Sequence, residues 1–231
     1  MRRPPRTGRG LLVERDGELG VLGDAIAAGA AGDGTVVVVH GPPGIGKTAL
    51  LAEAGLRARE AGLLPLAASG TDPERDLAFG CTRRMLEATL LSAPASERAE
   101  LLSGPAALAG PAVLGLPAEP PVPELSLAVL HSLYWLVAEL AARQPLALIL
   151  DDAHWADQPT LRFFGYLARR LDGLPVALIA SARPGEGEPN HELISALLNV
   201  PAARELRPAP LSEAGVAAML AGSTDRICSR T

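Results

Sequence analysis

Short apolar runs alternate along this chain with longer segments in which apolar residues recur at helical spacing. Residues 35–40 (TVVVVH) form an unbroken β-branched run, which is typical of a buried strand in a parallel sheet. The other predicted strands are residues 63–68, 146–151, 175–181 and 204–207. Because strands and helices alternate, the pattern predicts an α/β fold of three α/β/α layers, with a parallel five-stranded sheet between helices.

Helical periodicity and capping residues predict the segments between these strands. In residues 16–30, Leu19, Leu22 and Ile26 share one helix face, and glycines then end the pattern. The other predicted helices are residues 48–59, 76–91, 96–102, 124–143, 158–171 and 191–198, with a last one that begins after Ser212. The stretch 104–123 is rich in proline and glycine, so we expect an irregular surface loop there.

The chain length of 231 residues suits one sizeable α/β domain. We expect this domain over residues 11–222, after a flexible basic tail at 1–10. Residues 69–145 are too long for a simple connection and predict a helical insert. Residues 223–231 form an atypical tail, which indicates a truncation.

Composition narrows the possible classes of protein. The chain is 48% hydrophobic and 20% charged, which favours a buried core over disorder. Its net charge of −5 argues against a large nucleic-acid surface. Neither a secretory signal nor an apolar run long enough to span a membrane is present in the sequence, so we expect a cytoplasmic protein without a membrane partner. Cys81 and Cys228 lack metal-type spacing and are interpreted as unrelated thiols.

The segment GPPGIGKT, directly after the first predicted strand, fits G-x-x-x-x-G-K-[ST], the phosphate-binding loop of nucleoside triphosphatases. Its glycines allow backbone N–H groups to surround a phosphate chain, and the following helix adds its N-terminal dipole. Lys47, the only lysine in the sequence, supplies a compact charge, and Thr48 offers a hydroxyl to Mg²⁺. The residues expected to bind nucleotide here are Gly41, Pro42, Pro43, Gly44, Ile45, Gly46, Lys47, Thr48 and Ala49.

A second acidic element follows the apolar run at residues 146–151. A strand that buries itself and ends in Asp151-Asp152 has the pattern of a Walker B element. Asp151 is expected to hold Mg²⁺ together with Thr48. Asp152 is then placed to orient or deprotonate an attacking water molecule.

Two further residues leave alternatives open, and a third has one preferred interpretation. Arg183 follows the strand at 175–181, and it lies near a γ-phosphate if that strand runs between the other two site strands; otherwise it is a solvated surface arginine. His154 is either a polar sensor near the γ-phosphate or a loop residue that packs. Trp155 is expected to fill the core.

Five motifs occur in a characteristic order: ERDGEL from Glu14, GPPGIGKT, DLAFG at 76–80, LILDDAHWAD at 148–157 and SARP at 181–184. In this set the chain resembles the signal-transduction ATPases with numerous domains. It is most similar to the AAA-like ATPase module of large ATP-binding LuxR-type transcriptional regulators. The resemblance covers about residues 11–221.

The resemblance implies a P-loop NTPase sheet with strand order 5-1-4-3-2. It also implies that Lys47 and Thr48 contact the nucleotide, Asp151 holds Mg²⁺ and Arg183 acts as the sensor. An adenine pocket formed by Val13, Glu14 and Arg15 is implied as well. Such regulators continue into a lid and a helix-turn-helix domain that this sequence does not contain, so DNA binding is not expected from this segment, and self-association or a protein partner would depend on those missing domains.

Three functions remain open at this point. The first is an ATP- and Mg²⁺-binding switch that hydrolyses ATP slowly and whose partners are ATP and ADP. The second is a nucleotide-binding module without catalysis. The third is a P-loop kinase of small molecules, which the paired aspartates and the long insert disfavour.

Overall fold

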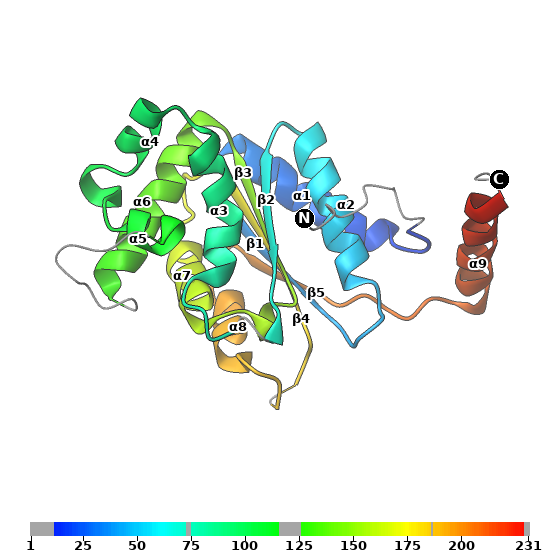
Figure 1. Ribbon diagram of the computed structural model, residues 1–231. Helices are drawn as coiled ribbons and strands as arrows, with labels where there is room; N and C mark the ends of the chain where they lie inside the picture. The colour runs from blue at the N-terminus through cyan, green and yellow to red at the C-terminus, as the bar shows by residue number, and fades with distance from the viewer. Residues whose placement is uncertain (1–11, 73–74, 116–125, 186, 229–231) are drawn as a thin grey trace.

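A parallel sheet runs through the middle of the molecule (Figure 1). The computed structural model describes residues 12–72, 75–115, 126–185 and 187–228, with the backbone alone over residues 221–228. The strands are β1 (Thr35–His40), β2 (Leu64–Ser69), β3 (Leu146–Asp151), β4 (Val176–Ala182) and β5 (Ala203–Leu206). The order across the sheet is β2-β3-β4-β1-β5, and every neighbouring pair is parallel. This is the predicted order, read from the opposite edge, so the predicted fold is confirmed.

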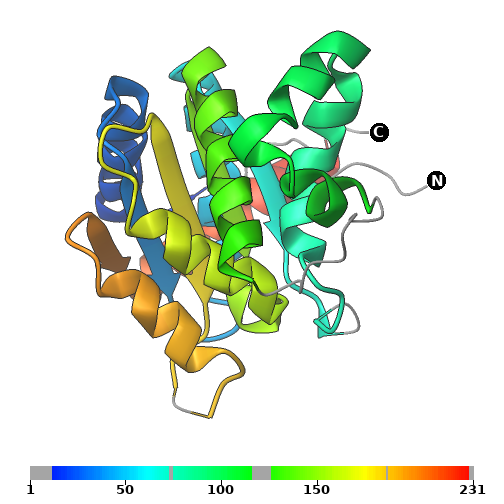
Figure 2. The ribbon, with the colours of Figure 1, turned by 90° about the vertical axis from the view of Figure 1, so that its left-hand side faces the viewer.

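Helices cover both faces of the sheet. The helices are α1 (Asp16–Ala31), α2 (Lys47–Glu60), α3 (Gly80–Ser92), α4 (Ala95–Leu101), α5 (Ala109–Leu114), α6 (Leu127–Arg143), α7 (Gln158–Ala168), α8 (His191–Leu198) and α9 (Glu213–Cys228), with short 3-10 turns η2 (Gly104–Ala106) and η3 (Ala153–Trp155). Helices α1 and α2 lie on one face, whereas α6, α7 and α8 cross the other, which Figure 2 turns toward the viewer.

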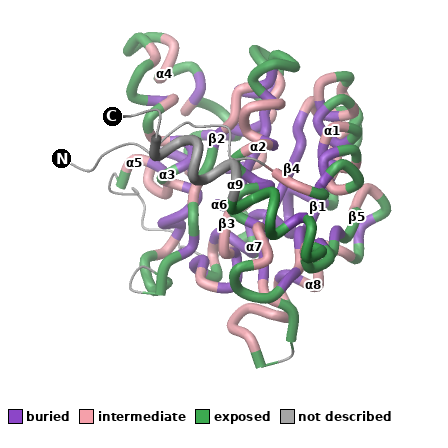
Figure 3. Tube along the Cα trace, turned by 90° about the vertical axis from the view of Figure 1, so that its right-hand side faces the viewer, coloured by how far each residue is buried: buried purple, intermediate pink, exposed green. Residues whose placement is uncertain are grey.

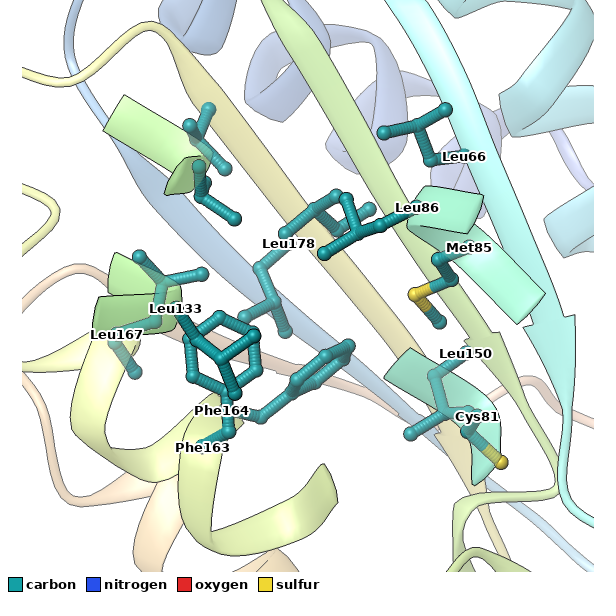
Figure 4. Packing of buried hydrophobic residues seen from close by; sticks show 14 of the residues in the cluster. Leu66, Cys81, Met85, Leu86, Leu133, Leu150, Phe163, Phe164, Leu167 and Leu178 are labelled. Atoms are coloured by element: carbon teal, nitrogen blue, oxygen red, sulfur yellow. The ribbon is translucent and has the colours of Figure 1, made fainter. Parts of the chain in front are cut away.

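The β-branched run of β1 supplies side chains to both hydrophobic cores. Val37 and Val39 pack with α1 and α2. Val36 and Val38 face the larger cluster on the opposite side, where Phe163 and Phe164 of α7 lie among leucines (Figure 4). A strand buried on both faces has no polar alternation, which explains its continuous apolar sequence. The buried centre between exposed outer helix faces is visible in Figure 3.

Most predicted elements are present, with shifts at their ends, and one prediction is wrong. The expected irregular stretch at 104–123 contains η2 and α5 over its first part, and residues 116–125 lie outside the described residues. Pro105 lies in the first turn of η2, where its missing N–H costs little. Ala109 and Val113 of α5 are buried in the larger core, so packing outweighs the weak local helix signal.

The start of α3 and the end of α7 differ from the predicted boundaries, and the shift of α3 has a visible cause. Helix α3 begins at Gly80 instead of residue 76, because Phe79 adopts a left-handed conformation with φ 55° just before it. Helix α7 ends at Ala168, short of the predicted residue 171. Helix α9 begins after Ser212, as predicted, and continues to Cys228.

Helix α9 extends away from the sheet and its covering helices (Figure 1). Its side chains Val216, Met219 and Leu220 are exposed. Among the described residues, none of the helices is both long and apolar enough to cross a membrane.

Candidate nucleotide-binding site

The phosphate loop joins the carboxyl end of β1 to the first turn of α2. Gly44 and Gly46 have φ values of 79° and 103°, in the region that glycine enters without steric cost. A Cβ on Gly41 would lie 2.7 Å from the Cγ2 atom of Ile45, so this turn also needs the absence of a side chain. The sequence therefore folds the loop into the curved backbone that the motif predicts.

Lys47 is held inside this loop. Its ammonium group donates hydrogen bonds to the carbonyl oxygens of Gly41 at 2.7 Å and Pro42 at 3.0 Å, and the residue is 6% exposed. Burial lowers the pKa of the ammonium, while the carboxylate of Asp152 acts in the opposite direction. The positive charge of Lys47 therefore lies at the centre of the loop and close to the acidic residues that follow β3.

Strand β4 lies between β1 and β3, which meets the condition set for Arg183. Arg183 follows the last residue of β4 and contributes to the electrostatic environment of the Lys47 ammonium. The carboxyl ends of β1, β4 and β3 thus bring Lys47, Arg183 and Asp151 to one edge of the sheet, where ligands of such folds bind.

Ser181 links β4 to its neighbour β3 at the carboxyl ends of these two strands. Its hydroxyl donates a 2.5 Å hydrogen bond to Asp151 Oδ1 and accepts one of 2.9 Å from the backbone N–H of Asp152. The same N–H lies 3.0 Å from Asp151 Oδ1. These bonds fix Asp151 through one carboxylate oxygen and leave the other without a partner among the described residues.

The donor set fits Mg²⁺ bound together with phosphates. Thr48 is exposed in the first turn of α2, and both Thr48 and Asp151 offer hard oxygen ligands. The described residues contain no group of three or more His, Cys, Asp or Glu side chains that could hold a metal by themselves. Mg²⁺ characteristically completes its shell with water and substrate phosphates, so a site with few protein ligands suits it.

The turn after β3 carries Asp152 and His154 and is fixed by its neighbours. Asp152 adopts a left-handed conformation with φ 48°. A Cβ on Gly70, which follows β2, would lie 2.4 Å from the carbonyl oxygen of Asp152, so the two backbones are in close contact. The side-chain amide of Asn190 donates to the carbonyl oxygens of His154 at 3.3 Å and Ala156 at 2.8 Å.

Two neighbouring residues of this turn differ in burial, and Trp155 departs from its predicted position in the core. His154 is completely buried, and neither of its ring nitrogens has a hydrogen-bond partner within the described part of the chain. Trp155, predicted to fill the core, is only half-buried.

The segment before α1 contacts the phosphate loop through one residue. The guanidinium group of Arg15 donates to the carbonyl oxygen of Ile45 at 3.2 Å and pairs with Glu18 at 3.3 Å. The side chain of Glu14 instead binds the start of α9, where it accepts a 2.8 Å hydrogen bond from the backbone N–H of Ser212. Val13 is half-buried. Of the predicted adenine-pocket residues, Arg15 reaches the phosphate loop and Glu14 does not.

A family model for the AAA ATPase domain matches residues 11–179. The chain belongs to the AAA ATPase domain family. A curated relative, the uncharacterized protein R02095 of Rhizobium meliloti (strain 1021), is 26% identical over 208 residues, with 76% of this chain and 19% of that protein covered. The chain therefore spans about a fifth of the length of the relative that it matches.

Solved structures share the fold of this AAA ATPase domain. Cdc6p from Pyrobaculum aerophilum superposes with a TM-score of 0.56 at 16% identity, over 94% of this chain and 51% of that one. The ORC1 protein of Aeropyrum pernix, solved in complex with DNA, gives a TM-score of 0.51 at 20% identity, over 94% and 50% of the two chains. At these identities the likeness supports the fold alone. The chain spans about half the length of either protein.

Sequence reasoning missed two residues that shape the site of this AAA ATPase domain. Ser181 was recognisable only as a residue at a strand end, because its role depends on which strand lies beside β4. Asn190 lies in a left-handed conformation with φ 62° before α8, and its contact with the turn after β3 spans 34 residues to Ala156. No local sequence pattern identifies either contact.

Proposed function

We propose that this AAA ATPase domain is a nucleotide switch that binds ATP with Mg²⁺ and hydrolyses it slowly. The observation that carries the proposal is the position of Lys47, whose ammonium group is buried inside a glycine loop and bound to the carbonyl oxygens of Gly41 and Pro42. The charges of Asp152, Arg183 and Asp151 act on this ammonium group. Positive charge in the loop suits the phosphate chain, and the carboxylates beyond it suit a metal ion and a water molecule.

Each side chain has a distinct role in this proposal. Thr48 and Asp151 would hold Mg²⁺, which would supply positive charge to offset the charge of the phosphates. Asp152 orients the attacking water molecule and accepts its proton. Arg183 contacts the γ-phosphate, so that its guanidinium group distinguishes ATP from ADP.

The wider setting that we propose is a large LuxR-type regulator in which this domain reports nucleotide state. Support comes from the ordered motifs. The net charge of −5 favours a role without direct DNA contact for this segment. Differential affinity for ATP and ADP is what would allow such a domain to shift a regulator between two states.

Replacement of Lys47 tests the proposal. Calorimetric titration of Lys47→Ala should show an ATP affinity lower by about 1.5–3 kcal/mol, because a charge-assisted phosphate contact is removed. Arg59→Ala, which removes an exposed cation from the same helix, is the matched control and should bind ATP like the wild type. An ATP affinity within twofold of wild type for Lys47→Ala would exclude the loop as the phosphate site, and phosphate release measured in parallel reports whether the bound ATP is hydrolysed.

A further inference from the structure

The imidazole of His154 is a buried polar group without a protein partner. The residue has 0% exposure, and neither Nδ1 nor Nε2 forms a hydrogen bond with the described residues. Buried polar side chains in native proteins nearly always have at least one partner, so an exception calls for an explanation. A neutral imidazole has one donor and one acceptor nitrogen, and here both lack a partner.

A structural histidine elsewhere in the same chain provides a comparison. His131 on α6 uses both ring nitrogens: Nδ1 lies 2.9 Å from the Tyr166 hydroxyl, and Nε2 accepts from the Trp135 indole N–H at 2.9 Å. The two ring nitrogens of the fully buried His154 have no hydrogen-bond partner among the described residues. The centroid of its ring lies 5.5 Å from the centroid of the Trp155 ring.

The surroundings of His154 are those of the nucleotide site. His154 lies two residues after Asp152, whose backbone N–H donates a 2.9 Å hydrogen bond to Ser181. The charges of Asp152, Arg183, Glu188 and Lys47 act on the imidazole of His154. Three of these residues are the ones that the proposed function assigns to the phosphate chain and the attacking water. Burial also lowers the pKa of the imidazole, which favours the neutral form.

The backbone that carries His154 is fixed in place. Asn190 binds the carbonyl oxygens on both sides of Trp155, and Gly70 lies too close to the turn for any side chain. Asp157 holds the end of the turn by capping α7. Because the backbone is fixed and the ring is fully covered, a phosphate reaches the imidazole only through rotation of side chains at the site, without movement of the turn.

We propose that His154 is a specificity-determining residue whose imidazole N–H donates a hydrogen bond to the terminal phosphate of a bound nucleoside triphosphate. Phosphate oxygens are strong acceptors, and a diphosphate lacks the terminal group that would be reached. This inference rests on the proposed function and deepens it, because it adds a neutral donor beside the charged Arg183.

The decisive variant is His154→Leu in the full chain, which keeps an apolar side chain in the buried position and removes both unpaired nitrogens. Calorimetry with Mg²⁺ should show ATP affinity reduced about 10- to 100-fold, the range for a hydrogen bond to a charged group, and ADP affinity within about twofold. Thermal unfolding without nucleotide should occur at an unchanged or higher temperature, because an unpaired buried polar group has been removed.

His131→Leu is the matched control and should give the opposite pattern. It leaves the Tyr166 hydroxyl and the Trp135 indole without their imidazole partner, so its unfolding temperature should fall while both nucleotide affinities stay unchanged. If His154→Leu behaves like this control, or loses ATP and ADP affinity equally, His154 is a structural residue and the inference is overturned.

A measurement on the wild type avoids any dependence on how the variant folds. Nitrogen-15 NMR of the imidazoles should show one ring nitrogen of His154 shifting with a non-hydrolysable ATP analogue and staying unshifted with ADP. Identical spectra with the two nucleotides would contradict the proposal. His154→Gln, which retains an N–H donor, should keep part of the preference for ATP.

Parallel titration of Lys47→Ala separates this inference from the proposed function. Suppose that Lys47→Ala loses ATP affinity while His154→Leu keeps the wild-type ratio of ATP affinity to ADP affinity. The nucleotide site would then be supported, and only the role of His154 would be refuted. Retention of ATP affinity in Lys47→Ala would refute the proposed function itself.

Discussion

The backbone N–H of Cys81 donates a 3.0 Å hydrogen bond to Asp157 Oδ2 across a separation of 76 residues. The other oxygen of this carboxylate accepts from the backbone N–H of Thr160 at 2.8 Å. One buried side chain therefore caps the first turns of both α3 and α7 and joins the helical insert to the turn that carries Asp152.

Asp157→Ala should lower the free energy of unfolding by about 2–4 kcal/mol, because it removes two helix caps and leaves buried donors unpaired. Urea unfolding followed by circular dichroism measures this change. Asp157→Asn retains one acceptor oxygen, so its free energy of unfolding should fall less than that of Asp157→Ala. Asp172→Ala, at an exposed position, serves as the control, and equal stability of the two alanine variants would show that the double cap contributes little.

Asp151→Asn and Asp152→Asn should affect different steps. Asp151→Asn should weaken Mg²⁺-dependent ATP binding, because an amide is a poorer ligand for a hard cation than a carboxylate. Asp152→Asn should spare binding and lower turnover, because an amide cannot take a proton from water. Titrations with Mg²⁺ and with a chelator, combined with phosphate-release assays, separate the two effects, and equal losses of Mg-ATP affinity in both variants would refute the assignment.

Arg183→Ala should cost ATP more binding free energy than ADP, by about 1–3 kcal/mol, since only ATP carries the γ-phosphate that the guanidinium is proposed to contact. Arg183→Lys should recover only part of the difference, because a point charge replaces a two-pronged donor. Arg169→Ala removes an exposed arginine next to α7 and controls for net charge. Equal losses for ATP and ADP would make Arg183 a general electrostatic residue.

Glu14→Ala should remove the hydrogen bonds that hold Ser212 at the start of α9. The Glu14 carboxylate accepts from both the hydroxyl and the backbone N–H of Ser212, and these bonds hold the pKa of Glu14 below its ordinary value. Hydrogen exchange at Ser212 and Val216 should therefore speed up in the variant, whereas Glu213→Ala should leave the Ser212 amide as protected as in the wild type.

The same contact predicts a pH dependence of definite sign. Because the pKa of Glu14 is lowered in the folded chain, the contact is fully present above the ordinary pKa of a glutamate and is lost as pH falls through the lowered value. Protection of the Ser212 amide should decrease at acid pH in the wild type and stay low at every pH in Glu14→Ala. Protection that is independent of pH in the wild type would exclude the carboxylate as its cause.

Local sequence signals were sufficient to predict the structure of segments whose conformation depends mainly on their own residues. The β-branched run of β1 and the glycines of the phosphate loop specify a buried strand and a curved turn without help from distant residues. The acidic end of β3 was likewise recognisable, since an apolar strand that ends in aspartate places the carboxylate at the sheet edge. These features were enough to predict the sheet, and they placed the candidate site residues at the carboxyl ends of its strands.

Features that depend on distant partners could not be predicted in the same way. The start of α3 is fixed by Asp157 and by the left-handed Phe79, and α5 forms because Val113 is buried in the core. The unpaired state of His154 is visible only when every neighbour is in place. For this reason, the sequence alone could not decide whether His154 is a sensor or a packing residue.

The position of β1 in the sheet also sets when this site forms during synthesis. Its two neighbours, β4 and β5, lie in residues 176–206, far downstream of the phosphate loop at 41–48. A ribosome releases the loop long before it releases the strands that hold β1 in the sheet, and long-range parallel pairing is slow to form. A nascent chain that ends before β4 should therefore expose an apolar β1 and fail to retain nucleotide. The ability to bind nucleotide should appear abruptly once β5 has emerged from the ribosome.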